Sequence, residues 1–277
     1  MGACQTSGFL VYHFYMPKHP LTLCFPILIL SIAALATWYV LDRETAPREI
    51  GAPDSRVLGS ITENEAYYEV EAVYPTATPL RSSAGITADS EAVATIEAFL
   101  KADIASFKED SGILSLTEED ATFIGLSDTR KYVYGAEYSE HRGAATLSYL
   151  YSIYVDTLGV HPNGYHHSFT FDMSTGELLS LSSLFEESGY LEQLSSISRD
   201  ELPRIISKKT GGLPEEVNTD MLLSGTAPSE ENFSTFYLTD AELVIVFSPY
   251  QVGPWAIGTQ TLPIPLSELQ GLRSAYR

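Results

Sequence analysis

Apolar and charged positions divide the chain at residue 41. Residues 21–41 are 21 positions without a charged side chain, and a helix of this length spans about 30 Å, the thickness of the hydrocarbon core of a bilayer. The sequence Ala34-Leu35-Ala36 has the form that a signal peptidase accepts, but the apolar run continues beyond it to Leu41. The pattern therefore predicts a transmembrane anchor over 21–41 after a short tail, 1–20, with a cleaved signal peptide as the alternative.

Beyond the anchor, the pattern changes from a linker to packed elements. Residues 42–64 are rich in Pro, Gly and charged side chains, a composition typical of a linker. Between Asp89 and Lys108, apolar residues recur at spacings of three and four, which predicts a helix. Its apolar stripe consists of Val93, Ile96, Phe99, Leu100, Ile104 and Phe107. Asp103 and Lys108 are among the residues expected to face water.

Aromatic and β-branched runs with a period of two predict the strands. They occupy residues 66–73, 131–138, 144–155, 165–172 and 178–181. The turn sequence Pro162-Asn163-Gly164 favours antiparallel pairing of the strands beside it, so we expect an antiparallel meander.

The C-terminal part adds a second helix and a hairpin. A helical stretch near 188–209 is expected to break at Pro203. A hairpin and a last short strand follow at 233–238, 243–247 and 261–266. We therefore expect the α+β class, with an antiparallel sheet packed against a few helices and preceded by one transmembrane helix. The folded part is expected to comprise two halves, 65–185 and 186–277.

The charge of the chain is strongly acidic and unevenly placed. There are 16 Lys and Arg against 36 Asp and Glu, a formal net charge of −20, which excludes recognition of nucleic acid through a broad basic surface. Lys18 is the only charged residue before residue 42, so residues 42–277 carry −21. Because a tail of about 20 residues is too small to fold alone, we expect the acidic part outside the cell membrane. Such a charge attracts cationic partners.

The cysteines and histidines do not indicate a metal site. Cys4 and Cys24 both precede residue 42, so the folded part has neither a disulfide nor a thiolate ligand. His161, His166 and His167 cluster in sequence, but neighbouring residues of a strand point to opposite faces, whereas zinc needs three or four converging ligands. We expect an exposed His166, and a His167 packed against aromatic side chains.

Catalytic motifs are absent from the sequence. It contains no G-x-S-x-G, S-x-x-K, H-E-x-x-H, P-loop or G-x-G-x-x-G pattern. Acidic doublets such as Glu118-Glu119 are typical of solvated surface. We therefore expect neither an enzyme nor a cofactor.

The loop 248–256 has the composition of a contact site. Pro249, Gly253 and Pro254 restrict its shape, while Tyr250 and Trp255 offer large, rigid and amphipathic surfaces. These rings would serve either to bind a partner or to cover the end of the sheet, and the sequence leaves both roles open.

Two stretches of the chain together resemble one family. The first comprises His161-Pro162, a strand ending in Phe171-Asp172, the turn Thr175-Gly176 and Leu184-Phe185. The second comprises residues 233–238 and 243–247, Pro249-Tyr250, Gly253-Pro254, Gly258 and Ile264-Pro265. In this order they resemble the RsiV-like extracytoplasmic domains over about residues 66–272. That family includes the outer domain of a membrane-bound anti-sigma factor that senses lysozyme, and its first half accompanies peptidoglycan deacetylases.

The resemblance implies an α+β domain on the outer side of a bacterial membrane that binds cell-wall material or a wall-directed protein. We therefore expect a single-pass membrane protein that recognises peptidoglycan or a cationic, lysozyme-like protein without catalysis. The expected binding residues are His161, Pro249, Tyr250 and Trp255. Two alternatives stay open. One is an envelope hydrolase acting on peptidoglycan with His161 or His167 and a nearby Asp, and the other is a structural spacer.

Overall fold

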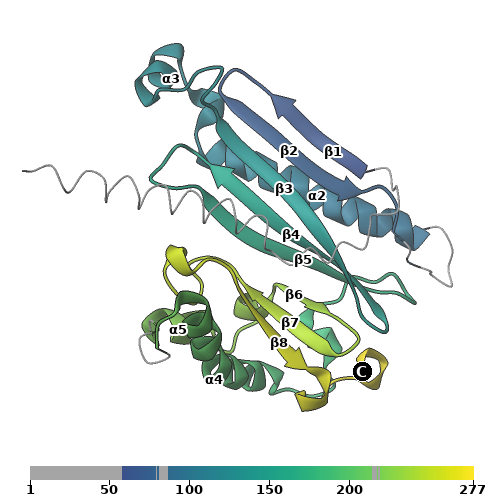
Figure 1. Ribbon diagram of the computed structural model, residues 1–277. Coiled ribbons are helices and arrows are strands. Elements are labelled where there is room, and N and C mark those ends of the chain that lie inside the picture. Colours follow the sequence, from purple (N-terminus) through teal and green to yellow (C-terminus); the bar gives the residue numbers. More distant parts are fainter. Residues whose placement is uncertain (1–57, 79, 81–86, 214–216, 218) are drawn as a thin grey trace, which may run out of the picture. The chain divides into compact units, whose positions relative to one another are not determined.

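The computed structural model describes residues 58–277 apart from 79, 81–86, 214–216 and 218 (Figure 1). The predicted tail, the anchor at 21–41 and most of the predicted linker lie outside these residues. Within the described part of the chain, no helix is long and apolar enough to cross a membrane.

A five-stranded sheet forms the first half of the fold. Its strands lie side by side in chain order: β1 (Leu58–Asn64), β2 (Tyr68–Pro75), β3 (Tyr132–Arg142), β4 (Thr146–Asp156) and β5 (Asn163–Asp172). β2 and β3 pair in parallel, whereas the other pairs are antiparallel. The expectation of an antiparallel sheet is therefore wrong at this pair, because a helical crossover between β2 and β3 returns the chain to the same end of the sheet. Residues 58–64, assigned by composition to the linker, form the edge strand β1.

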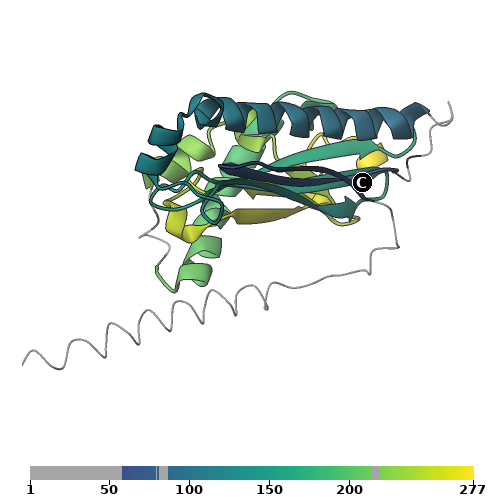
Figure 2. The same ribbon diagram turned by 90° about the horizontal axis from the view of Figure 1, so that it is seen from above.

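Helix α2 (Thr87–Asp110) provides that crossover, and the stripe of apolar residues correctly predicts the helix itself. Figure 2 shows α2 lying along one face of the five-stranded sheet. Its buried side chains recur at helical spacing: Ala92, Ile96, Leu100, Ile104 and Phe107. They join the strands in one apolar cluster, and this burial is the main stabilisation of the first half.

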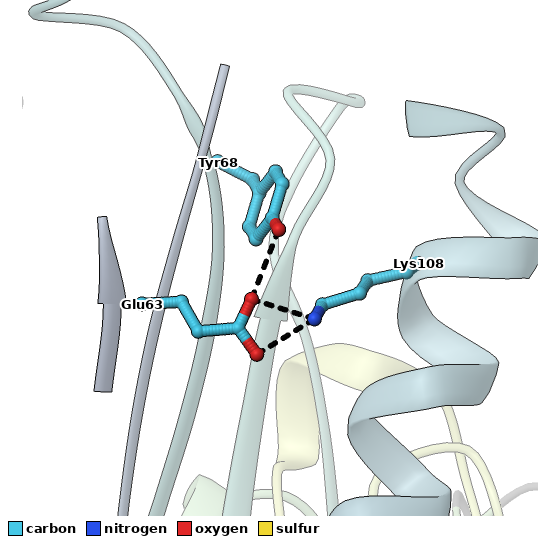
Figure 3. Close-up of polar contacts among 3 residues, drawn as sticks. All are labelled: Glu63, Tyr68 and Lys108. Atoms are coloured by element: carbon cyan, nitrogen blue, oxygen red, sulfur yellow. Dashed lines mark hydrogen bonds and ion pairs between the residues drawn. The ribbon is translucent and has the colours of Figure 1, made fainter. Parts of the chain in front are cut away.

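A polar contact ties the C-terminal end of α2 to β1 and β2 (Figure 3). Lys108 Nζ lies 2.7 and 2.6 Å from the two carboxylate oxygens of Glu63, and the Tyr68 hydroxyl donates to Glu63 Oε2 at 2.9 Å. The bond from Lys108 is the main cause that lowers the pKa of Glu63. Burial, followed by the bond to Glu63, raises the pKa of Tyr68 to about 12. Lys108 is therefore bound to a strand and does not face water as expected.

The second half contains a three-stranded antiparallel sheet with helices beside it. β6 (Phe236–Leu238), β7 (Glu242–Phe247) and β8 (Gln260–Pro265) pair in this order, and α4 (Tyr190–Thr210) contacts β8 (Figure 1). The edge strand β8 carries Pro263 and Pro265. Among the described residues, two further helices are α3 (Glu118–Ile124), which belongs to the first half, and α5 (Thr219–Gly225). Short 3-10 turns lie at Ile113–Ser115, Leu181–Leu184, Glu231–Phe233, Trp255–Ile257, Leu266–Glu268 and Ser274–Tyr276.

Two local expectations fail, one in each half. α4 continues through Pro203 and does not break there. Leu202 and Ile206 on either side of Pro203 are almost fully buried, so burial outweighs the lost backbone bond. The strand expected at 178–181 is reduced to a bridge between Phe171 and Leu178, and a 3-10 turn follows. The α+β class is confirmed, with a mixed sheet and a second small sheet.

The two sheets meet through hydroxyl groups of β5. Ser168 Oγ accepts a bond from Phe236 N at 2.8 Å, and Thr170 Oγ1 donates to Phe236 O at 3.2 Å. Thr170 and its neighbour Ser148, 2.9 Å apart at their hydroxyl oxygens, are fully buried. The hydroxyls of Ser168 and Thr170 thus bond to the backbone groups of Phe236 that have no partner strand within the sheet of β6.

We expect Lys108→Met to lower the free energy of unfolding at neutral pH by about 1 kcal/mol, because it leaves the partly buried carboxylate of Glu63 without its cation. The folded pKa of Glu63 lies below its usual value of 4.5, so this stabilisation is complete above pH 4.5 and is lost as the pH falls below that value. Urea titrations at neutral and acidic pH measure the difference between wild type and variant, which should shrink in acid.

Lys101→Met is the matched control, because it breaks an exposed ion pair with Glu97 on the same helix. We expect a loss below about 0.5 kcal/mol. Equal losses for the two variants would contradict a structural role of the Glu63–Lys108 pair.

We expect Thr170→Val to cost about 1–3 kcal/mol, since it keeps the shape of the side chain but leaves Phe236 O and Ser148 with one partner fewer in a buried site. Thr95→Val, which removes an exposed bond to Glu91 O on α2, should cost much less because water replaces the bond. Chemical denaturation of both variants tests whether the hydroxyls hold the two sheets together, and similar costs would argue against it.

Candidate functional site

A groove lies where α2, the ends of β4 and β5, and the loop after β7 come together. Its volume is about 660 Å³, within the range of pockets that bind small molecules. The lining residues are Asp103, Ser106, Phe107, Asp110, Ser111, Tyr132, Val155, Thr157, His161, Asn163, Tyr165 and Tyr250. The lining thus combines aromatic rings with carboxylates, hydroxyls and one amide.

Helix α2 supplies the carboxylates of the groove. Asp103, Phe107 and Asp110 follow one another at spacings of four and three, so they share one side of the helix. The hydroxyls of Tyr134 and Tyr165 both donate to Asp103 Oδ2, each at 2.6 Å. Burial, and next the bond to Asp103, raises the pKa of both phenols well above the usual range, so they stay neutral donors. Asp103 is therefore half-buried and held in place, and the expectation that it faces water is wrong.

His161 and Tyr250 form the wall of the groove opposite α2. His161 Nδ1 lies 2.9 Å from Pro162 O, and Nε2 lies 2.9 Å from the Tyr250 hydroxyl. Because a carbonyl oxygen only accepts, Nδ1 carries the hydrogen of the neutral ring and Nε2 accepts from Tyr250. Trp255 stacks on His161, with ring centroids 4.4 Å apart. The imidazole is therefore fixed from two sides.

The loop that carries Tyr250 is attached to its surroundings by polar contacts. Ser248 Oγ accepts from the backbone N–H of His166 at 3.0 Å. The Gln251 amide donates to the carbonyls of Gly225 and Asn232, at 3.3 and 2.8 Å. A Cβ at Gly225 would lie 1.9 Å from Gln251 O, so only glycine lets the loop approach α5 this closely.

Backbone strain is concentrated at this site. Among the described residues other than glycine, positive φ angles occur at Leu158, 58°, and Tyr250, 70°. The first lies between β4 and His161, and the second forms a bond with His161. Such strain costs of order 1–3 kcal/mol per residue and persists where the surrounding structure enforces it, often at a functional site.

The four predicted binding residues are thus brought together to different degrees. His161 and Tyr250 line the groove. Trp255, with 40% of its surface exposed, is outside the lining and supports His161. Pro249 precedes Tyr250 and is outside the lining. The sequence analysis did not identify Asp103 and Asp110 as site residues. Their spacing, which places both on one side of a helix that packs on aromatic strands, was the signal that could have indicated them.

His166 and His167 point to opposite faces of β5, as strand alternation predicts. His167 stacks on Phe99, with centroids 4.1 Å apart, whereas the backbone of His166 bonds to Ser248 of the second half. His166 is half-buried and not exposed as expected. Burial lowers the pKa of both imidazoles, and Asp103 partly opposes this at His167. In the part of the chain that the structure describes, no group of three or more His, Cys, Asp or Glu could hold a metal ion.

Comparison with one solved structure shows a shared fold. A member of the DUF3298 family from Bacteroides fragilis NCTC 9343 superposes with a TM-score of 0.52 at 16% identity, over 80% of this chain and 95% of that one. A DUF3298 protein from Pseudomonas aeruginosa PAO1 gives a TM-score of 0.48 at 12% identity, over 80% and 97%.

Among characterised proteins, the chain is similar to the peptidoglycan-N-acetylmuramic acid deacetylase PdaC of Bacillus subtilis strain 168. The two are 30% identical over 133 residues, which make up 48% of this chain and 27% of PdaC. The chain thus corresponds to about a quarter of that protein. The narrower resemblance to RsiV-like domains is not confirmed by these matches. Residues 182–267, which include the loop of Tyr250 and Trp255, match the family DUF3298, described as a protein of unknown function.

Proposed function

We propose that this protein is a binding module of the bacterial cell envelope whose groove recognises a glycan of the cell wall without catalysis. The observation that carries the proposal is the lining of the groove, where the rings of His161, Tyr165 and Tyr250 face hydroxyls and carboxylates in one cavity. Sugar rings combine apolar C–H faces with many hydroxyls. Aromatic rings pack against the C–H faces, and carboxylate, amide and hydroxyl groups form hydrogen bonds with the sugar hydroxyls.

The similarity to PdaC supports a wall polymer as the ligand. The name of that protein places its activity on the N-acetylmuramic acid of peptidoglycan. Because only 27% of its length is matched, the shared part is proposed to contribute attachment to the wall, and the deacetylase activity is not transferred to this chain.

The sequence supports a proposal for the environment of the module. Residues 21–41 are proposed to anchor the chain by a single pass, with the acidic domain on the outer side of the membrane. The net charge of −20 supports a cationic wall-directed protein as a second class of partner, because long-range attraction speeds encounter. Salt would weaken that interaction.

A second candidate function is hydrolysis of peptidoglycan. The observation that favours it is the electrostatic influence of Asp103 on His167, which partly opposes the lowering of the His167 pKa by burial. A neutral imidazole beside a carboxylate is one way to build a general base. His167 is stacked on Phe99 and is outside the lining of the groove, so this pair supports the hydrolase less well than the lining supports binding.

We expect the double variant Tyr250→Ala, Trp255→Ala to bind insoluble peptidoglycan at least about tenfold more weakly, because it removes one wall of the groove and the support of His161. Co-sedimentation of the full chain with purified peptidoglycan measures this. Phe123→Ala, which removes an exposed ring of α3 outside the groove, is the control and should bind as wild type does. Unchanged binding by the double variant would place the binding surface outside the groove, and absence of binding by the wild type would favour a structural spacer.

We expect the full chain to release no soluble fragments from purified peptidoglycan above the buffer background. Release that His167→Ala abolishes and His141→Ala preserves would establish the hydrolase in place of the binding module. His141 is a suitable control because burial lowers its pKa as well, and it stacks on Tyr237 and does not line the groove.

A further inference from the structure

The groove carries an unbalanced negative charge. Its twelve lining residues include Asp103 and Asp110 but neither Lys nor Arg. The lysines nearest in sequence to these carboxylates have partners elsewhere. Lys108 is bound to Glu63, Lys101 to Glu97, and Lys131 to Asn64. A ligand that enters the groove therefore meets two carboxylates that no cation of the lining neutralises.

Asp103 is arranged to accept a further bond. Both tyrosine hydroxyls bond to its Oδ2, and no described residue donates to Oδ1. Two neutral donors orient the carboxylate without cancelling its charge. Because Asp103 is half-buried, its charge acts in a medium less polarisable than bulk water, and a cation placed beside it gains more than it would at an open surface.

The walls of the groove also suit a cation. The rings of Tyr165 and Tyr250 line it, and the face of an aromatic ring attracts an ammonium group. Asp110 lies on the same side of α2 as Asp103, almost two turns further along. A primary ammonium has three donors, enough to reach one carboxylate and neighbouring hydroxyls at once.

We propose that the groove selects a free, protonated amino group on an amino sugar over its N-acetylated form. This rests on the proposed function and specifies which glycan the module prefers. Acetylation of an amine removes its charge, so the acetylated sugar loses the attraction of Asp103 and Asp110 while its ring still fits the walls. A diamino acid of a wall peptide offers the same ammonium chemistry, but it lacks the sugar ring that the aromatic walls and the hydroxyls of Ser106 and Thr157 suit.

The test compares three probes by calorimetric titration of the full chain at mildly acidic pH. They are a β-1,4-linked glucosamine pentasaccharide, its fully N-acetylated counterpart and a short peptide with a free lysine side chain. We expect the glucosamine oligomer to bind at least about tenfold more tightly than the acetylated one, equivalent to about 1.4 kcal/mol, and more tightly than the peptide. Asp110→Asn should reduce the preference to about threefold or less.

Asp200→Asn provides the matched control, since it removes one negative charge from an exposed position of α4 away from the groove lining. It should leave the preference intact, and an equal loss in both variants would overturn the proposal in favour of non-specific attraction. Equal affinity for the two oligosaccharides would overturn the preference for the amine and leave the proposed glycan binding standing. Tighter binding of the peptide would reassign the site to a wall peptide. Binding of neither oligosaccharide would overturn both proposals.

Discussion

The outer edge of β6 is buried against β5, and much of the structure depends on how its backbone is satisfied. A strand edge presents N–H and carbonyl groups that need partners once water is excluded. Ser168 and Thr170 provide them by bonding to the two backbone groups of Phe236. β5 therefore has two functions, because its other face places His167 and Phe169 against Phe99 of α2. The contact between the halves is directional, which fixes their mutual placement more closely than an apolar contact of the same area.

This placement positions the groove. The loop after β7 begins at Ser248, which is bonded to the backbone of β5, and Gln251 attaches it to α5 and to the segment before β6. Tyr250 is thereby held in an unfavourable backbone conformation beside His161. On the opposite wall, Tyr134 and Tyr165 hold Asp103. Each wall is thus fixed before a ligand arrives, and pre-organisation reduces the entropy lost on binding.

The spacing of apolar residues predicted individual helices and strands and the face that each one buries. The stripe of α2 and the alternation of β5 are confirmed, because apolar period reports which face of an element is buried. Period does not report which strand lies beside which, so the parallel pairing of β2 with β3 was missed. Pro203 was judged by its backbone cost alone, whereas burial of Leu202 and Ile206 decides the outcome.

Asp103 was missed as a site residue because its partners Tyr134 and Tyr165 lie 31 and 62 residues away. Composition singled out Tyr250 and Trp255 but left their role open; the structure places Tyr250 in the lining of the groove and stacks Trp255 on His161.

The prolines of β8 bear on how copies of this domain behave near one another. High local concentration favours pairing between exposed strands of neighbouring molecules. Pro263 and Pro265 occur at alternate positions of β8 and have no N–H to donate along its outer side. That side is therefore poorly suited to extending into an intermolecular sheet. Crowded copies would therefore remain individually folded.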